Sequence, residues 1–77
     1  MKTMTCEQLG GACDMEFRGN TFEEIMAQSK AHGREMFKQK DNAHLKAMQD
    51  MQALMQSPEV MQEWLEAKRR QFENLPD

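Results

Sequence analysis

The chain has 77 residues, of which 39% are hydrophobic and 30% are charged, and its formal net charge is −3. This length allows one domain, and the composition excludes a disordered tail, a membrane protein and a binder that neutralises nucleic-acid phosphates. No run approaches the roughly 20 apolar residues of a membrane span. The first residues lack the apolar core of a signal peptide, so we expect a cytoplasmic protein in a reducing compartment.

Residues 1–19 hold the only strand-like segments, two short runs in which polar and apolar side chains alternate. In the second run we expect Met15 and Phe17 to face inward and their neighbours to face solvent. Paired glycines lie between the two runs. The pattern predicts a β-hairpin with a wide loop at 6–13.

Three helices are expected after the hairpin, at about 22–37, 43–56 and 58–74, because apolar residues recur there at helical spacing. Each segment is preceded by residues of the types that cap helix N-termini, and the candidates are Thr21, Asp41 or Asn42, and Ser57. The predicted fold class is therefore α+β. It consists of a small N-terminal β-hairpin followed by three α-helices, the first two forming a helical hairpin, in a single domain over 1–77.

The chain contains nine methionines, and several lie on helix faces that are expected to be apolar. Met48, Met51 and Met55 share one face of the second helix. The apolar face of the third helix consists of Met61, Trp64, Leu65 and Phe72. These faces exceed what one small core can bury, which predicts a homodimer. Thioethers also bind Cu(I), but a methionine stripe at helical spacing is more typical of packing.

The residues best suited to bind an ion are Cys6, Cys13, His32 and His44. Two thiolates with two imidazoles are a common tetrahedral ligand set for zinc. On a helical wheel His32 lies about 20° from Ile25, on the core side, and His44 lies on the methionine face. If the first two helices are antiparallel, the two histidines are offset along the helix axis by only about 6 Å. The alternative is two small buried cysteines beside two histidines that bind nothing.

Other kinds of site fit the sequence less well. A thiol redox centre favours Cys-x-x-Cys, whereas six residues separate Cys6 from Cys13, and the acidic neighbours Glu7 and Asp14 disfavour thiolates. The sequence indicates neither a carboxylate set among apolar residues nor a phosphate-binding glycine loop, so we do not expect an enzyme. The basic run at 68–70 is explained by ion pairs with acidic residues on the same helix.

The first 25 residues contain a recognisable motif. It consists of Met1-Lys2-Thr3-Met4-Thr5-Cys6-Glu7-Gln8-Leu9-Gly10-Gly11-Ala12-Cys13-Asp14, then Phe17 and Thr21-Phe22-Glu23-Glu24-Ile25. These residues resemble a family of small prokaryotic proteins catalogued as domain of unknown function 1059 and described as predicted small metal-binding proteins. The resemblance implies a family core at 1–40 and a C-terminal helical extension at 41–77.

The same resemblance implies which residues bind the metal. The family pattern matches Cys6, Cys13 and His32 of this chain. Many members have a second histidine five residues after the first, where this chain has Phe37, and His44 is the expected replacement.

We therefore expect a small protein that binds a metal ion, with zinc as the first choice, at a closed Cys/His site of structural or storage type. The expected ligands are Cys6, Cys13, His32 and His44. The alternative is a metal-free helical interaction module that self-associates through its Met-rich helix faces. Neither function involves nucleic acid or a membrane.

Overall fold

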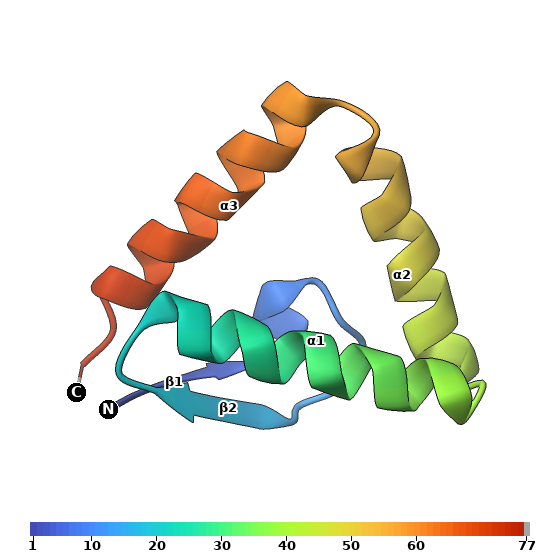
Figure 1. Cartoon of the computed structure of the whole chain (residues 1–77), viewed down its shortest axis with the longest axis horizontal. Coiled ribbons are helices and arrows are strands. Elements are labelled where there is room, and N and C mark those ends of the chain that lie inside the picture. The colour runs from blue at the N-terminus through green and yellow to red at the C-terminus, as the bar shows by residue number, and fades with distance from the viewer. Residues whose placement is uncertain (77) are drawn as a thin grey trace.

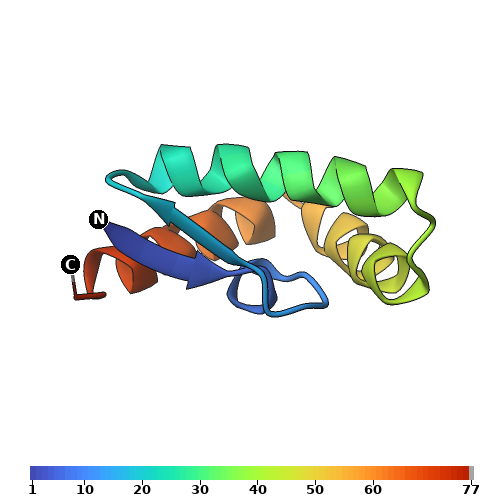
Figure 2. The same cartoon turned by 90° about the horizontal axis from the view of Figure 1, so that it is seen from below.

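The computed structural model describes residues 1–76 and begins with the expected antiparallel hairpin. Strand β1 (Lys2–Thr5) pairs with strand β2 (Glu16–Gly19) in a register that sets Met4 opposite Phe17. Both of these side chains are buried, because α1 (Phe22–Lys38) covers one face of the hairpin (Figure 2). Two strands without such a cover are only marginally stable in water.

The inward orientation predicted for the second run is confirmed at Phe17 and wrong at Met15. The Met15 side chain is 49% exposed. Strand β2 begins only at Glu16, so Met15 belongs to the loop and the alternation of the strand does not position its side chain.

The loop between the strands contains a 3-10 helix at Glu7–Leu9, which the sequence patterns did not reveal. Two backbone hydrogen bonds close the loop at its base: the Cys6 N–H donates to the Met15 carbonyl at 2.8 Å, and the Glu7 N–H donates to the Cys13 carbonyl at 3.0 Å. Gly10 ends the 3-10 helix with φ of 91°, a left-handed conformation that glycine adopts without strain. The loop is therefore ordered rather than an open linker.

All three helices form close to the predicted bounds: α1 at Phe22–Lys38, α2 at Asn42–Met55 and α3 at Pro58–Glu73. The N-caps are also confirmed. The side chains of Thr21, Asp41 and Ser57 each accept a hydrogen bond from the backbone N–H three residues later. These bonds satisfy donors that a helix leaves free in its first turn, so local sequence defines where each helix begins.

The three helices lie along the sides of a triangle (Figure 1). Helix α2 starts near the C-terminal end of α1 and runs away from α1 at a steep angle. The first two helices therefore do not form the antiparallel hairpin that was expected, and α3 returns toward the start of α1. There Phe72 packs edge to face against Phe22, with ring centroids 6.0 Å apart. An ion pair between Arg69 and Glu23 at 2.8 Å joins α3 to α1 beside these rings, and the hydrogen bond from Arg69 lowers the pKa of Glu23.

The core lies between the hairpin, α1 and the end of α3. Its buried apolar members are Met4, Cys6, Leu9, Phe17, Phe22, Ile25 and Phe72. On the apolar face of the third helix only Phe72 is buried and Met61 is 38% exposed, because α3 contacts the core only near its C-terminal end. Among residues 1–76, no helix is long and apolar enough to cross a membrane.

Candidate metal centre

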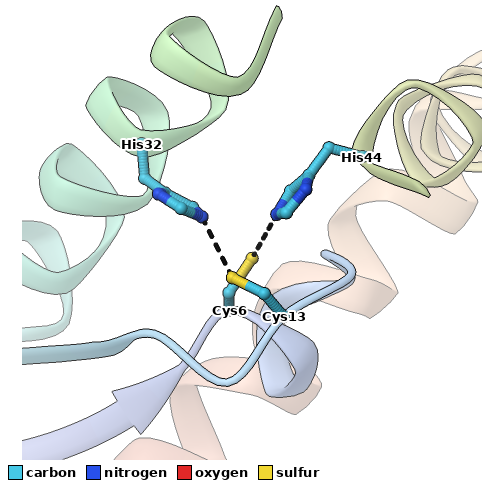
Figure 3. A group of neighbouring side chains, drawn as sticks. All are labelled: Cys6, Cys13, His32 and His44. Atoms are coloured by element: carbon cyan, nitrogen blue, oxygen red, sulfur yellow. Dashed lines mark hydrogen bonds between the residues drawn. The ribbon is translucent and has the colours of Figure 1, made fainter. Parts of the chain in front are cut away.

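The structure brings the four predicted residues together between the hairpin loop and the first two helices. Cys6 directly follows β1 and Cys13 lies across the same loop, while His32 belongs to α1 and His44 to the first turn of α2. Their possible ligand atoms all lie within 4.8 Å of one another. Figure 3 shows both imidazole rings pointing toward the two sulfur atoms. These four side chains form the Cys/His cluster.

Two thiol–imidazole contacts connect the members of the cluster. Cys6 Sγ lies 3.7 Å from His44 Nε2, and Cys13 Sγ lies 3.3 Å from His32 Nε2. The two imidazole rings meet edge to face with centroids 5.2 Å apart, and His32 also packs edge-on against Phe17 at 5.6 Å. The packing therefore fixes the directions of both rings, which is what a preorganised ligand set requires.

The spacing of the donor atoms fits a tetrahedral zinc ion. Zn–S bonds of about 2.3 Å and Zn–N bonds of about 2.0–2.1 Å separate neighbouring ligand atoms by about 3.3–3.8 Å. The two sulfur–nitrogen contacts, 3.3 and 3.7 Å, fall within this range. The largest separation in the cluster, 4.8 Å, exceeds the range by about 1 Å, which small side-chain rotations can close. Two thiolates would also balance the charge of a divalent ion.

Asp41 holds His44 in the orientation that a metal ligand needs. Its carboxylate accepts a hydrogen bond from His44 Nδ1 at 2.5 Å and from the His44 backbone N–H at 3.0 Å. Because a carboxylate only accepts, this bond requires a proton on Nδ1 and leaves Nε2 as the ring nitrogen that faces Cys6. Carboxylate–histidine pairs of this kind commonly support zinc ligands. Both hydrogen bonds lower the pKa of Asp41, and the one from the His44 ring has the larger effect.

The turn between α1 and α2 places Asp41 where its carboxylate can accept hydrogen bonds from His44. The N–H groups of Lys40 and Asp41 donate to the carbonyls of Phe37 and Met36, which closes the end of α1 in the pattern of a Schellman motif. Lys40 has φ of 55°, the left-handed conformation this motif requires. Asp41 is thus both the last residue of the Schellman motif that ends α1 and the N-cap of α2.

The hairpin loop leaves no room for a side chain beside the Cys6 sulfur. A Cβ added to Gly11 would overlap Cys6 Sγ and would lie 3.0 Å from the Cys6 carbonyl oxygen. The Gly11 N–H donates to that same carbonyl at 2.8 Å. Glycine is therefore required at this position by close approach to the cluster rather than by a special backbone torsion.

Burial away from water raises the pKa of the Cys6 thiol, and the adjacent Cys13 thiol adds to the rise, while backbone hydrogen bonds at Cys13 and Ala12 oppose it. Without a metal ion the Cys6 thiol is therefore protonated at neutral pH. A metal ion that binds through Cys6 would therefore have to displace this proton.

The comparisons with known proteins assign this chain to a family but not to a function. Residues 1–47 match a family described as protein of unknown function (DUF1059). The chain belongs to the DUF1059 family. No curated protein and no solved structure gives a significant match to the chain. The segment that matches DUF1059 contains all four members of the Cys/His cluster and also Asp41.

The structure separates the predicted site residues from their alternatives. The fourth position of the cluster contains His44, whereas Phe37, where the resemblance led us to expect a histidine in the family pattern, is 63% exposed and lies outside the cluster. The sequence patterns identified Asp41 only as a candidate helix cap and did not assign Gly11 a role. Asp41 could have been found, because an N-cap carboxylate three residues before a histidine can reach both the backbone and the ring.

Replacement of Asp41 by serine tests its role as the partner of His44. Serine caps helices as well as aspartate does but is too short to hold the ring, so we expect metal affinity to fall by roughly 10- to 100-fold. The melting temperature of the chelated protein should change little. Competition with a chromophoric chelator measures the affinity. Asp41→Ala removes the cap as well and should lower the melting temperature; unchanged affinity in Asp41→Ser would contradict the role.

The raised pKa of Cys6 predicts how the stability of the chelated protein depends on pH. The folded state holds the thiol proton more tightly than the unfolded state, so this stabilisation is complete below roughly pH 8.5, the usual pKa of a free thiol. It is lost as the pH rises through the folded-state pKa. We expect the melting temperature of chelated protein to fall more steeply between neutral and alkaline pH than that of Cys6→Ser. Parallel curves for the two proteins would contradict the prediction.

Proposed function

We propose that this protein binds one zinc ion through the Cys/His cluster and that the site is closed, serving a structural or storage role. The observation that carries the proposal is the convergence of two sulfur and two imidazole nitrogen atoms from three separate segments within 4.8 Å. Thiolate and imidazole ligands in a tetrahedral set favour zinc over magnesium or calcium, which prefer oxygen. Both cysteines are free thiols, consistent with a protein of a reducing compartment such as the cytoplasm.

Four protein donors leave no coordination position for a water molecule, and that argues against catalysis. A catalytic zinc site keeps three protein ligands and one open position. Here His44 is buried and its free nitrogen is directed at Cys6, so its simplest use is to complete the shell. Asp41, the carboxylate hydrogen-bonded within the site, is occupied by His44 and is not available as a general base. We therefore propose that the protein is not an enzyme.

The direct test of this function is the coordination shell of protein purified without chelator. We expect one zinc ion per chain, and X-ray absorption at the zinc edge should report two sulfur and two nitrogen neighbours. A shell of three protein ligands with a water oxygen, or protein that contains no metal and takes up none on addition of zinc, would contradict the proposal.

His44 and Phe37 provide a matched pair of variants. We expect His44→Ala to lose most of its zinc at micromolar free-metal concentrations, because three ligands and a water bind less tightly than a closed shell. Phe37→Ala, which lies outside the cluster, should retain the wild-type metal content. Elemental analysis after dialysis measures both. Equal zinc content in the two variants would show that His44 is not a ligand.

A further inference from the structure

The middle of the helix triangle is a broad apolar cavity that this chain does not fill. It has a volume of about 1040 Å³ and is lined by all three helices and by the hairpin loop. Its walls include Met26 of α1, Met48 and Met51 of α2, and Trp64 and Leu65 of α3. We refer to this cavity as the basin. Apolar side chains on three sides of an open hollow are costly to leave in water.

The same chain carries an apolar projection at the corner where α2 meets α3, the apex of the triangle in Figure 1. Four of the exposed large hydrophobic residues are found there: Leu54, Met55, Val60 and Met61, of which Met55 and Met61 also line the rim of the basin. Each is between 38% and 42% exposed. This group is the α2–α3 corner. A hollow and an apolar projection on one chain suit each other when two copies meet.

The surface area of the chain supports the need for a second copy. A compact monomer of 9.0 kDa exposes about 4,850 Å² by the usual scaling of surface with mass. This chain exposes 5502 Å², an excess of roughly 650 Å². A standard protein interface buries about 800 Å² on each partner, so the excess is close to what one stable interface removes. The molecule is also flat, with extents of 33 × 28 × 15 Å, and stacking two copies would double its thinnest dimension.

We propose that a second copy of this chain covers the basin, with the α2–α3 corner of each protomer seated over the basin of its partner. A two-fold axis makes the two contacts equivalent and closes the assembly, whereas a one-way contact would continue into fibres. Three of the four cluster residues, Cys6, His32 and His44, line the basin. The second copy therefore also covers the side of the Cys/His cluster that faces the basin.

The test measures the mass of the full chain in solution, with zinc and again with chelator, by sedimentation equilibrium over a wide concentration range. We expect twice the monomer mass for the wild type. Leu54→Glu places a charge on the corner, and Ala27→Glu places one on the exposed α1 wall of the basin. Each should raise the dissociation constant of the dimer roughly tenfold or more. Met15→Glu is the control, because it adds the same charge at an exposed apolar residue outside the basin.

Circular dichroism of each variant establishes that the helices are retained, so a loss of mass reports association and not unfolding. A monomeric wild type at every concentration would overturn the proposal. The occupant of the basin would then be a different protein or an apolar small molecule. A dimer that survives both Leu54→Glu and Ala27→Glu, or one that Met15→Glu disrupts equally, would overturn it as well. None of these outcomes depends on whether the cluster binds zinc, since the mass is measured in both states.

Discussion

Removal of the zinc ion that we propose for the Cys/His cluster is expected to lower the melting temperature of this protein by roughly 15 to 30 °C. A ligand present at a thousand times its dissociation constant stabilises the folded state by about 4 kcal/mol. For a domain of this size each kcal/mol corresponds to about 4–8 °C. The effect is large because the unfolded chain has no preformed site, so metal binding adds directly to the free energy of unfolding.

The variants that test this are Cys6→Ser and Cys13→Ser, alone and together. Each hydroxyl replaces a thiolate that zinc prefers, so metal content and melting temperature should fall in both single variants and most in the double variant. Ala12→Ser is the matched control, because it adds a hydroxyl to the same loop without removing a ligand. Differential scanning calorimetry with and without chelator measures the shift. Full zinc occupancy in the double variant would contradict the cluster as the metal site.

Two glycine-to-alanine substitutions are expected to act in opposite directions. In Gly11→Ala the new methyl group must displace the Cys6 sulfur or the loop, which should cost about 1–3 kcal/mol and weaken metal binding as well. Gly33 lies inside α1, and the methyl group added in Gly33→Ala meets only Cε of Met48 from α2, at 3.9 Å. That substitution should stabilise the protein by about 0.5–1 kcal/mol, because alanine favours helices.

Urea unfolding and zinc titration of both variants measure these effects. The pair separates a local steric requirement of the cluster from the general conformational preferences of glycine. If Gly11→Ala bound zinc with wild-type affinity, the close approach of Gly11 to Cys6 would not matter for the site. A destabilised Gly33→Ala would show that α1 and α2 pack more closely at this point than the 3.9 Å contact indicates.

The helices and their ends are the part of the fold that can be read from the sequence. The N-caps Thr21, Asp41 and Ser57 accept hydrogen bonds from N–H groups only three residues away, so a short segment of sequence is enough to predict them. Alternation along the second strand also indicated that Phe17 faces the core, whereas the register that sets Phe17 opposite Met4 is seen only in the structure. The identities of the four cluster residues were also predictable, because thiols and imidazoles are rare in this chain and chemically distinct.

The tertiary structure alone decided how these elements meet. His32 and His44 converge although their helices are not antiparallel, because the turn through Lys40 sets the direction of α2 and the hairpin loop brings the two thiols to the same point. The partnership of Asp41 with the His44 ring and the tight fit of Gly11 against Cys6 depend on that arrangement. Helical periodicity indicated which faces are apolar, but whether a neighbour covers a face depends on packing between distant segments. That packing leaves the basin open in a single chain.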